Sequence, residues 1–189
     1  MNGKTTVLLT SLAATMAVSM IIAPAAFAAT YLGIDGFDVQ TKDNNDNTRI
    51  KVNIDVGANV PLDGSGGAFG YAVFTGGFNN VLVLVTHLGI DDSEHEDPVS
   101  GFHTHVLDLM GPTSACADAD AEVDLANSVA NKGFDLDSNY SINGDKISVG
   151  YTPTSLLGGS TVTAVHSFTV EPVFDGSDNL TNLCVTVTG

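Results

Sequence analysis

Arg49-Ile50-Lys51-Val52-Asn53-Ile54-Asp55-Val56 alternates polar residues with branched apolar ones at every position. Because successive side chains on a β-strand point to opposite faces, this period of two predicts a strand with one buried face. The flanking segments 42–47 and 62–67 are rich in Asn, Asp and Gly, which favour turns. The stretch therefore indicates a β-structure with one strand between two turns.

Short apolar runs separated by turn clusters recur through the rest of the chain. The nine candidate strands are 31–40, 49–56, 70–75, 80–87, 101–109, 138–142, 146–151, 162–170 and 184–188. Asn143-Gly144, between two of these runs, is typical of a tight hairpin. The Ala-rich segment 114–132 does not follow this spacing of strands and turns, and we expect a short helix there. This spacing predicts one all-β domain, either an immunoglobulin-like β-sandwich or a Greek-key barrel.

The first 28 residues have the features of a secretory signal peptide. Lys4 precedes an uncharged apolar run, and Ala26-Phe27-Ala28 is the small-residue pattern that signal peptidase cleaves. We expect cleavage after Ala28, which leaves a domain of residues 29–189 in a periplasm-like space or at the cell surface, with no stable membrane insertion. The alternative is an N-terminal membrane anchor, since the apolar run is long enough for one.

The chain is strongly acidic, with a formal net charge of −16. Loss of Lys4 with the signal peptide would make the charge of the remaining domain one unit more negative. Such a surface repels nucleic acid and anionic lipid, so neither is expected as a partner. A charge of this kind also serves solubility alone. The sequence leaves the oligomeric state open, a homo-oligomer included.

Two cysteines are present, Cys116 and Cys184. Exported proteins reside in oxidising compartments, so we expect the two to form a disulfide bond. The alternative is a pair of buried free thiols.

Histidines are the residues that indicate chemistry in this chain. His103 and His105 flank Thr104, and side chains at positions i and i+2 of a strand lie on the same face, about 7 Å apart. Two such imidazoles can converge on one metal ion. His166 ends the apolar run Val162–Val165, and with the other two it would make an open three-histidine metal site. The alternative is a polar strand face, with His166 bonded to a backbone carbonyl.

Four segments follow one another in an order that is typical of one family: Gly101-Phe102-His103-Thr104-His105, then Cys116, then 147–166, which ends in His166, and finally 183–189, which contains Cys184. Together they resemble the copper–zinc superoxide dismutase family. The first segment is similar to the family's Gly-Phe-His-Val-His, which supplies two copper ligands. Cys116 follows shortly afterwards, as the family's first disulfide cysteine does. The segment 147–166 is similar to the family's two-strand stretch that ends in Val-Val-His, and 183–189 resembles the segment with the second disulfide cysteine. The resemblance covers residues 70–189.

This resemblance implies an eight-stranded antiparallel Greek-key barrel with copper at His103, His105 and His166, and superoxide as substrate. The family's zinc site would be missing, because 117–165 contains no histidine. A fourth copper-ligating histidine is also missing at its usual place. His95, in the acidic segment 91–97, or His87, at the end of a strand, would have to replace it; each is otherwise a histidine in solvent.

The family's anion-attracting arginine also has no counterpart. Its position holds Thr181, and the single arginine in the chain is Arg49. Three hypotheses therefore stand: a copper enzyme of the superoxide dismutase type, a protein that binds copper (zinc being less favoured) without catalysis, and a structural surface module without metal. We expect copper rather than zinc in either metal-binding case, and the enzymatic hypothesis is the one that the missing arginine weakens most.

Overall fold

The computed structural model describes residues 30–189 except 45–46, 88–89, 91–100, 135 and 137. The predicted signal peptide (1–28) and the acidic segment with His95 therefore lie outside the described residues. In the described part of the chain, no helix combines the length and the apolar character that crossing a membrane requires.

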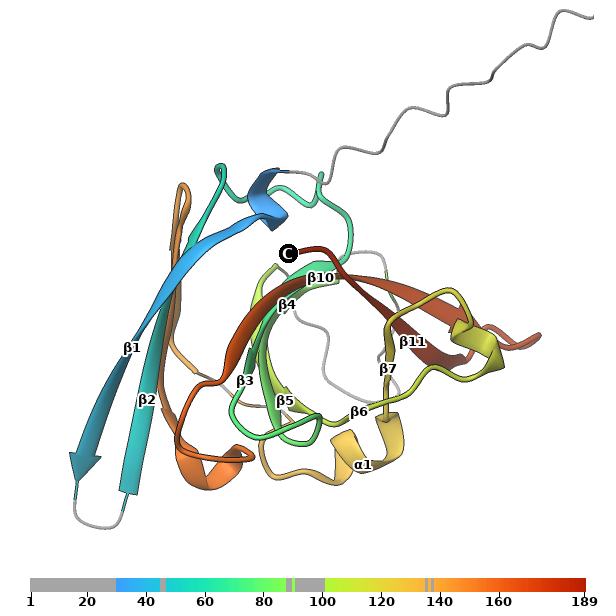
Figure 1. The fold of residues 1–189 in the computed structure, drawn as a ribbon. Helices are drawn as coiled ribbons and strands as arrows, with labels where there is room; N and C mark the ends of the chain where they lie inside the picture. Colours follow the sequence, from blue (N-terminus) through green and yellow to red (C-terminus); the bar gives the residue numbers. More distant parts are fainter. Residues whose placement is uncertain (1–29, 45–46, 88–89, 91–100, 135, 137) are drawn as a thin grey trace, which may run out of the picture.

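The described residues form eleven strands, one α-helix and three 3-10 helices (Figure 1). The strands are β1 (Ile34–Asn44), β2 (Asn47–Val56), β3 (Phe69–Phe74), β4 (Val81–Thr86), β5 (His103–Leu107), β6 (Leu109–Met110), β7 (Ala121–Val123), β8 (Tyr140–Asn143), β9 (Lys146–Pro153), β10 (Ala164–Phe174) and β11 (Leu180–Val187). The helices are η1 (Thr30–Leu32), η2 (Ser114–Cys116), α1 (Leu125–Ala130) and η3 (Thr154–Leu156).

The strands make two antiparallel sheets, which confirms the predicted all-β class. One sheet has the order β1-β2-β9-β8 and the other β5-β4-β3-β10-β11-β7-β6. The structure has eleven strands, whereas the resemblance implied eight. Two of the eleven are very short, β6 with two residues and β7 with three. The hairpin predicted at Asn143-Gly144 joins β8 to β9, and Gly144 has the positive φ, 65°, that its turn requires.

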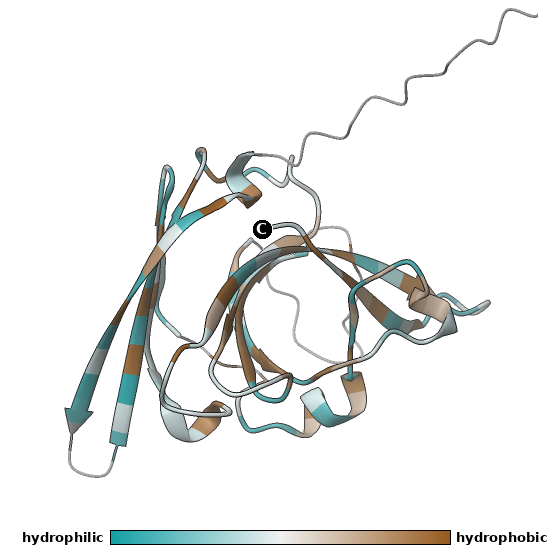
Figure 2. Cartoon of the chain, in the orientation of Figure 1, coloured by the Kyte–Doolittle hydropathy of each residue, from teal (hydrophilic) through white to brown (hydrophobic). Residues whose placement is uncertain are grey.

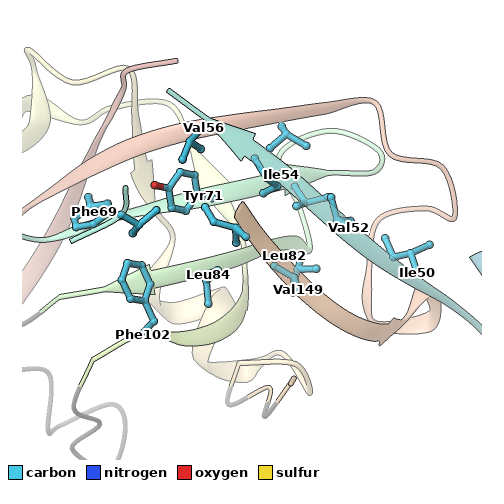
Figure 3. Packing of buried hydrophobic residues seen from close by; sticks show 14 of the residues in the cluster. Ile50, Val52, Ile54, Val56, Phe69, Tyr71, Leu82, Leu84, Phe102 and Val149 are labelled. Atoms are coloured by element: carbon cyan, nitrogen blue, oxygen red, sulfur yellow. The ribbon is translucent and has the colours of Figure 1, made fainter. Parts of the chain in front are cut away.

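The main core lies between the two sheets. Every apolar residue of the alternating stretch on β2 is at most 1% exposed, as its pattern predicted. In Figure 3, Ile54 and Val56 of β2 lie close to Tyr71 of β3, and Leu84 of β4 belongs to the same cluster. This packing fixes β3 and β4 against the smaller sheet.

β3 and β4 also bury their other face, which explains why neither strand alternates in polarity. Leu82 and Leu84 face the main core, whereas Val81, Val83 and Val85 belong to a second apolar cluster on the opposite side of the sheet. A strand that is covered on both sides reads as a continuous apolar run. The second cluster lies inside the curve of the larger sheet.

The larger sheet curls because its two ends are consecutive in the chain. β5 and β6 are the end strands of the sheet order, and a single residue, Asp108, separates them. β5 pairs with β4 while β6 pairs with β7, so the sheet bends round until its ends meet at Asp108. Figure 1 shows the resulting curved layer of strands, which we call the barrel.

The disulfide bond joins η2 to the barrel wall. Cys116 and Cys184 are bonded, as the sequence predicted, with Cys184 on β11. Glu122 lies opposite Cys184 on β7 and is only 2% exposed. Its carboxylate accepts hydrogen bonds from the Thr113 backbone and the Asn182 side chain, which tie the same elements together.

Candidate metal site

Three histidines meet at one rim of the barrel. One ring nitrogen from each of His87, His103 and His105 lies within 4.8 Å of the others. His105 is buried, at 5% exposure, and the other two are half-buried. Three imidazoles at this spacing could bind one metal ion.

Strand alternation explains why these rings share a side of the sheet. His103 and His105 are separated by one residue on β5, and they pair with Val85 and Val83 of β4. His87 follows Val85 by two positions, just beyond the end of β4. All three therefore point to the inner face of the barrel, with His87 diagonal to His103.

Backbone carbonyls orient two of the three rings. A carbonyl oxygen only accepts, so Nδ1–H of His105 donates to the Phe134 carbonyl at 2.7 Å. Nδ1–H of His103 donates in the same way to the Gly101 carbonyl at 3.2 Å. In this tautomer the lone pair of each ring is on its Nε2 atom. This is the arrangement in which metal-binding histidines are usually held.

The third ring, that of His87, forms a hydrogen bond with the nitrogen of His103 that a metal ion would need. His87 Nε2 lies 2.8 Å from His103 Nε2, and because the latter has the lone pair, the former carries the proton. The ring centroids of the pair are 4.6 Å apart, and the His103 and His105 centroids are 4.7 Å apart. A metal ion bound here would replace this N–H···N hydrogen bond, with the His87 proton lost or moved to Nδ1.

The 2.8 Å separation of the His87 and His103 nitrogens is that of their hydrogen bond. Binding of a metal ion between the two rings requires them to turn, so that each directs a nitrogen lone pair at the ion.

His166 does not join this group, so the expected convergence of His103, His105 and His166 from neighbouring strands is wrong. β10, which carries His166, is separated from β5 by β3 and β4. The Nδ1 atom of His166 bonds the Gly189 carbonyl at 3.1 Å, and its ring packs edge-on to Phe74. The carbonyl bond is the alternative that the sequence had left open. Strand order, which alternation does not determine, separates the two histidine positions.

Of the other residues that the sequence analysis singled out and the structure describes, only His87 lies in the histidine group. His87, one of two candidates for an extra ligand, belongs to the group, whereas His95 lies outside the described residues. Thr181 is exposed and its hydroxyl donates to the Val173 carbonyl. Arg49 lies on β2, which belongs to the other sheet.

The carbonyls of Gly101 and Phe134 are the site features that the sequence did not reveal. Phe134 follows α1 by four positions, and a hydrogen bond from Val106 to Gly133 holds its segment beside β5. Only the tertiary fold brings this segment to His105. Gly101, by contrast, has a φ of 88°, and a glycine two residues before a His-x-His strand is a local signal for a backbone turn.

Comparisons with protein-family models, with curated proteins and with solved structures each found no match for this chain. The resemblance to copper–zinc superoxide dismutases therefore remains a hypothesis that rests on the quoted motifs alone.

Proposed function

We propose that the protein binds Cu(II) outside the cytoplasm through His87, His103 and His105. The observation that carries the proposal is the convergence of three imidazole nitrogens within 4.8 Å at the barrel rim. Two of these rings are oriented by backbone carbonyls, which reduces the cost of ordering the ligands on binding. Three protein ligands leave at least one coordination position for water or another molecule.

The general order of metal affinities favours copper over zinc. Nitrogen sites bind Cu(II) more tightly than other divalent first-row ions. Zinc is the weaker candidate for the same site.

The disulfide bond supports the proposed location. Structural disulfides persist mainly in oxidising compartments, and this chain has its two cysteines paired. The signal-peptide pattern of residues 1–28 points to the same compartment.

Copper affinity in single variants tests the proposal. Structural zinc sites with four ligands are worth about 10–16 kcal/mol, or about 3 kcal/mol per ligand, so loss of one histidine should weaken binding roughly 100-fold. We expect this loss for His103→Ala and His105→Ala in calorimetric titrations with Cu(II). His166→Ala is the matched control and should bind as the unmodified protein does. No binding by the unmodified protein, or equal binding by all variants, would overturn the proposal.

Superoxide dismutation at the copper is a second candidate, which the Gly101–His105 motif and the disulfide favour. Two observations weaken it: the ligand group lacks His166, and the single arginine lies on β2 in the other sheet. A strongly acidic protein also repels an anionic substrate. If copper-loaded protein removes superoxide no faster than free copper does, this candidate fails and the binding function stands.

A further inference from the structure

The inner face of the barrel lines a partly open cavity of about 320 Å³. Alternation on each strand determines its lining, because every second residue points inward: Val83 and Val85 on β4, Phe168 and Val170 on β10, and Val185 on β11. The strands around it carry hydrophobic residues in Figure 2. A cavity of this size falls within the range of small-molecule sites.

Small side chains keep part of this space open. Ala72 of β3 pairs with Val83 of β4 on one side and with His166 of β10 on the other, and it lines the cavity. A larger residue there would extend into the cavity. Phe78 reaches the same cavity and is 65% exposed, so part of the lining also contacts solvent.

Two of the proposed metal ligands belong to this lining. His87 and His105 line the cavity, whereas His103 does not. The row of inward residues His105, Val83, Ala72 and His166 crosses four adjacent strands. The metal site and the apolar cavity therefore share one wall.

We propose that the barrel binds a small, uncharged, apolar molecule whose single electron-pair donor atom reaches the metal ion held by the three histidines. The cavity is the first half of this proposal and stands without the metal; the contact to the ion rests on the proposed copper function. The barrel is thus the binding site that selects which molecule meets the ion.

Size and charge define the ligand class. An apolar cavity of about 150 Å³ in another protein holds one benzene molecule, so 320 Å³ accommodates a molecule of about two ring systems. The described lining contains no lysine or arginine, and the chain is strongly acidic. A free anionic ligand would have no cationic side chain to pair with there. The one carboxylate of the described lining, Asp120, is exposed and already accepts from the Val187 backbone, so a cationic ligand has no buried partner either, and the class is neutral and mainly hydrocarbon.

The first experiment titrates the metal-free protein with the uncharged fluorophore N-phenyl-1-naphthylamine. We expect saturable enhancement of its fluorescence, and at least tenfold weaker binding in Ala72→Phe, which fills the cavity. Val129→Phe, on an exposed position of α1, is the matched control and should bind normally. Circular dichroism checks folding, and Val185→Phe replaces Ala72→Phe if the latter does not fold. Unchanged binding in folded cavity variants would overturn the proposal.

Two variants distinguish copper binding from binding of the fluorophore in the cavity. His103→Ala should bind copper roughly 100-fold more weakly yet still bind the fluorophore, because His103 is a ligand that does not line the cavity. Ala72→Phe should bind copper and lose the fluorophore. Failure of copper binding alone would therefore remove the metal proposal and leave the cavity proposal intact.

The second experiment tests whether a cavity ligand reaches the ion. Adding 4-phenylimidazole, an apolar molecule with one donor nitrogen, should change the electron paramagnetic resonance spectrum of the copper-loaded protein. The same addition should have at least tenfold weaker effect in copper-loaded Ala72→Phe, while imidazole alone should act equally on both proteins. Equal responses to 4-phenylimidazole in the two proteins would show that the ligand reaches copper from solvent, and would overturn the link between cavity and ion.

Discussion

Gly133→Ala tests whether the protein backbone orients a metal ligand. A Cβ atom added at Gly133 would lie 2.8 Å from both Cβ and Cγ2 of Val106, where ordinary contact begins at 3.4 Å. Val106 is fully buried and its branched side chain is stiff. The segment with Gly133 and Phe134 must therefore move by about 0.6 Å, the difference between these two distances.

That movement reaches the metal site through one hydrogen bond. The Phe134 carbonyl accepts from His105 Nδ1 at 2.7 Å, and a shift of 0.6 Å along this direction would lengthen the bond to about 3.3 Å, beyond the usual limit. Loss of such a partner typically lowers metal affinity by about 10–100-fold. Overpacking at Val106 should also lower the free energy of unfolding by about 1–3 kcal/mol.

Calorimetric titration with Cu(II) and thermal unfolding measure the two effects separately. Gly176→Ala is the control, since nothing lies within 4 Å of its added Cβ atom, and it should change neither quantity. A Gly133→Ala protein that is less stable but binds copper with unchanged affinity would refute the reasoning. The carbonyl would then have no part in orienting His105.

Two further predictions concern the wall with the disulfide. Replacing Cys116 and Cys184 by serine removes a crosslink over 68 positions, which should cost about 4 kcal/mol of unfolding free energy and leave copper affinity unchanged; an equal loss of copper affinity would contradict the separation of the two regions. Burial raises the pKa of Glu122, but hydrogen bonds from Asn182 and Thr113 outweigh it and hold this pKa below the ordinary 4.5. The carboxylate therefore stabilises the fold above pH 4.5 and loses this effect as pH falls through its lowered pKa, so denaturant unfolding at pH 7 and pH 3 should show a smaller difference in Glu122→Gln.

Local sequence patterns, either alternation or a short continuous apolar run, made most of the strands predictable. The pattern of Ile50, Val52, Ile54 and Val56 depends only on which face of β2 is buried, so it could be read without knowing the neighbouring strands. All nine candidate runs contain strand residues in the structure, and α1 lies in the Ala-rich segment where a helix was expected.

β7 was not predicted from the sequence, because the pairing that makes it a strand involves residues far away in the chain. Its residues 121–123 lie in the Ala-rich segment, and three residues are too few for their alternation to predict a strand. They become a strand because they pair with Val185 and Cys184 of β11 and with Leu109 and Met110 of β6. Such pairing depends on the curl of the whole sheet.

The site was predictable only in part for the same reason. The shared orientation of His103 and His105 follows from their spacing on one strand, and the inward direction of His87 follows from Val83 and Val85 before it. The position of His166 required the order of β5, β4, β3 and β10, which nothing within a single strand specifies. The cavity likewise appears only once the inward residues of several strands are brought together.

A crystal structure of the copper-loaded protein, with an anomalous difference map at the copper absorption edge, tests the central claim most directly. The account predicts one strong peak at the barrel rim, about 2 Å from a ring nitrogen of each of His87, His103 and His105. A peak at His166 instead, or no peak near these three rings, would contradict it.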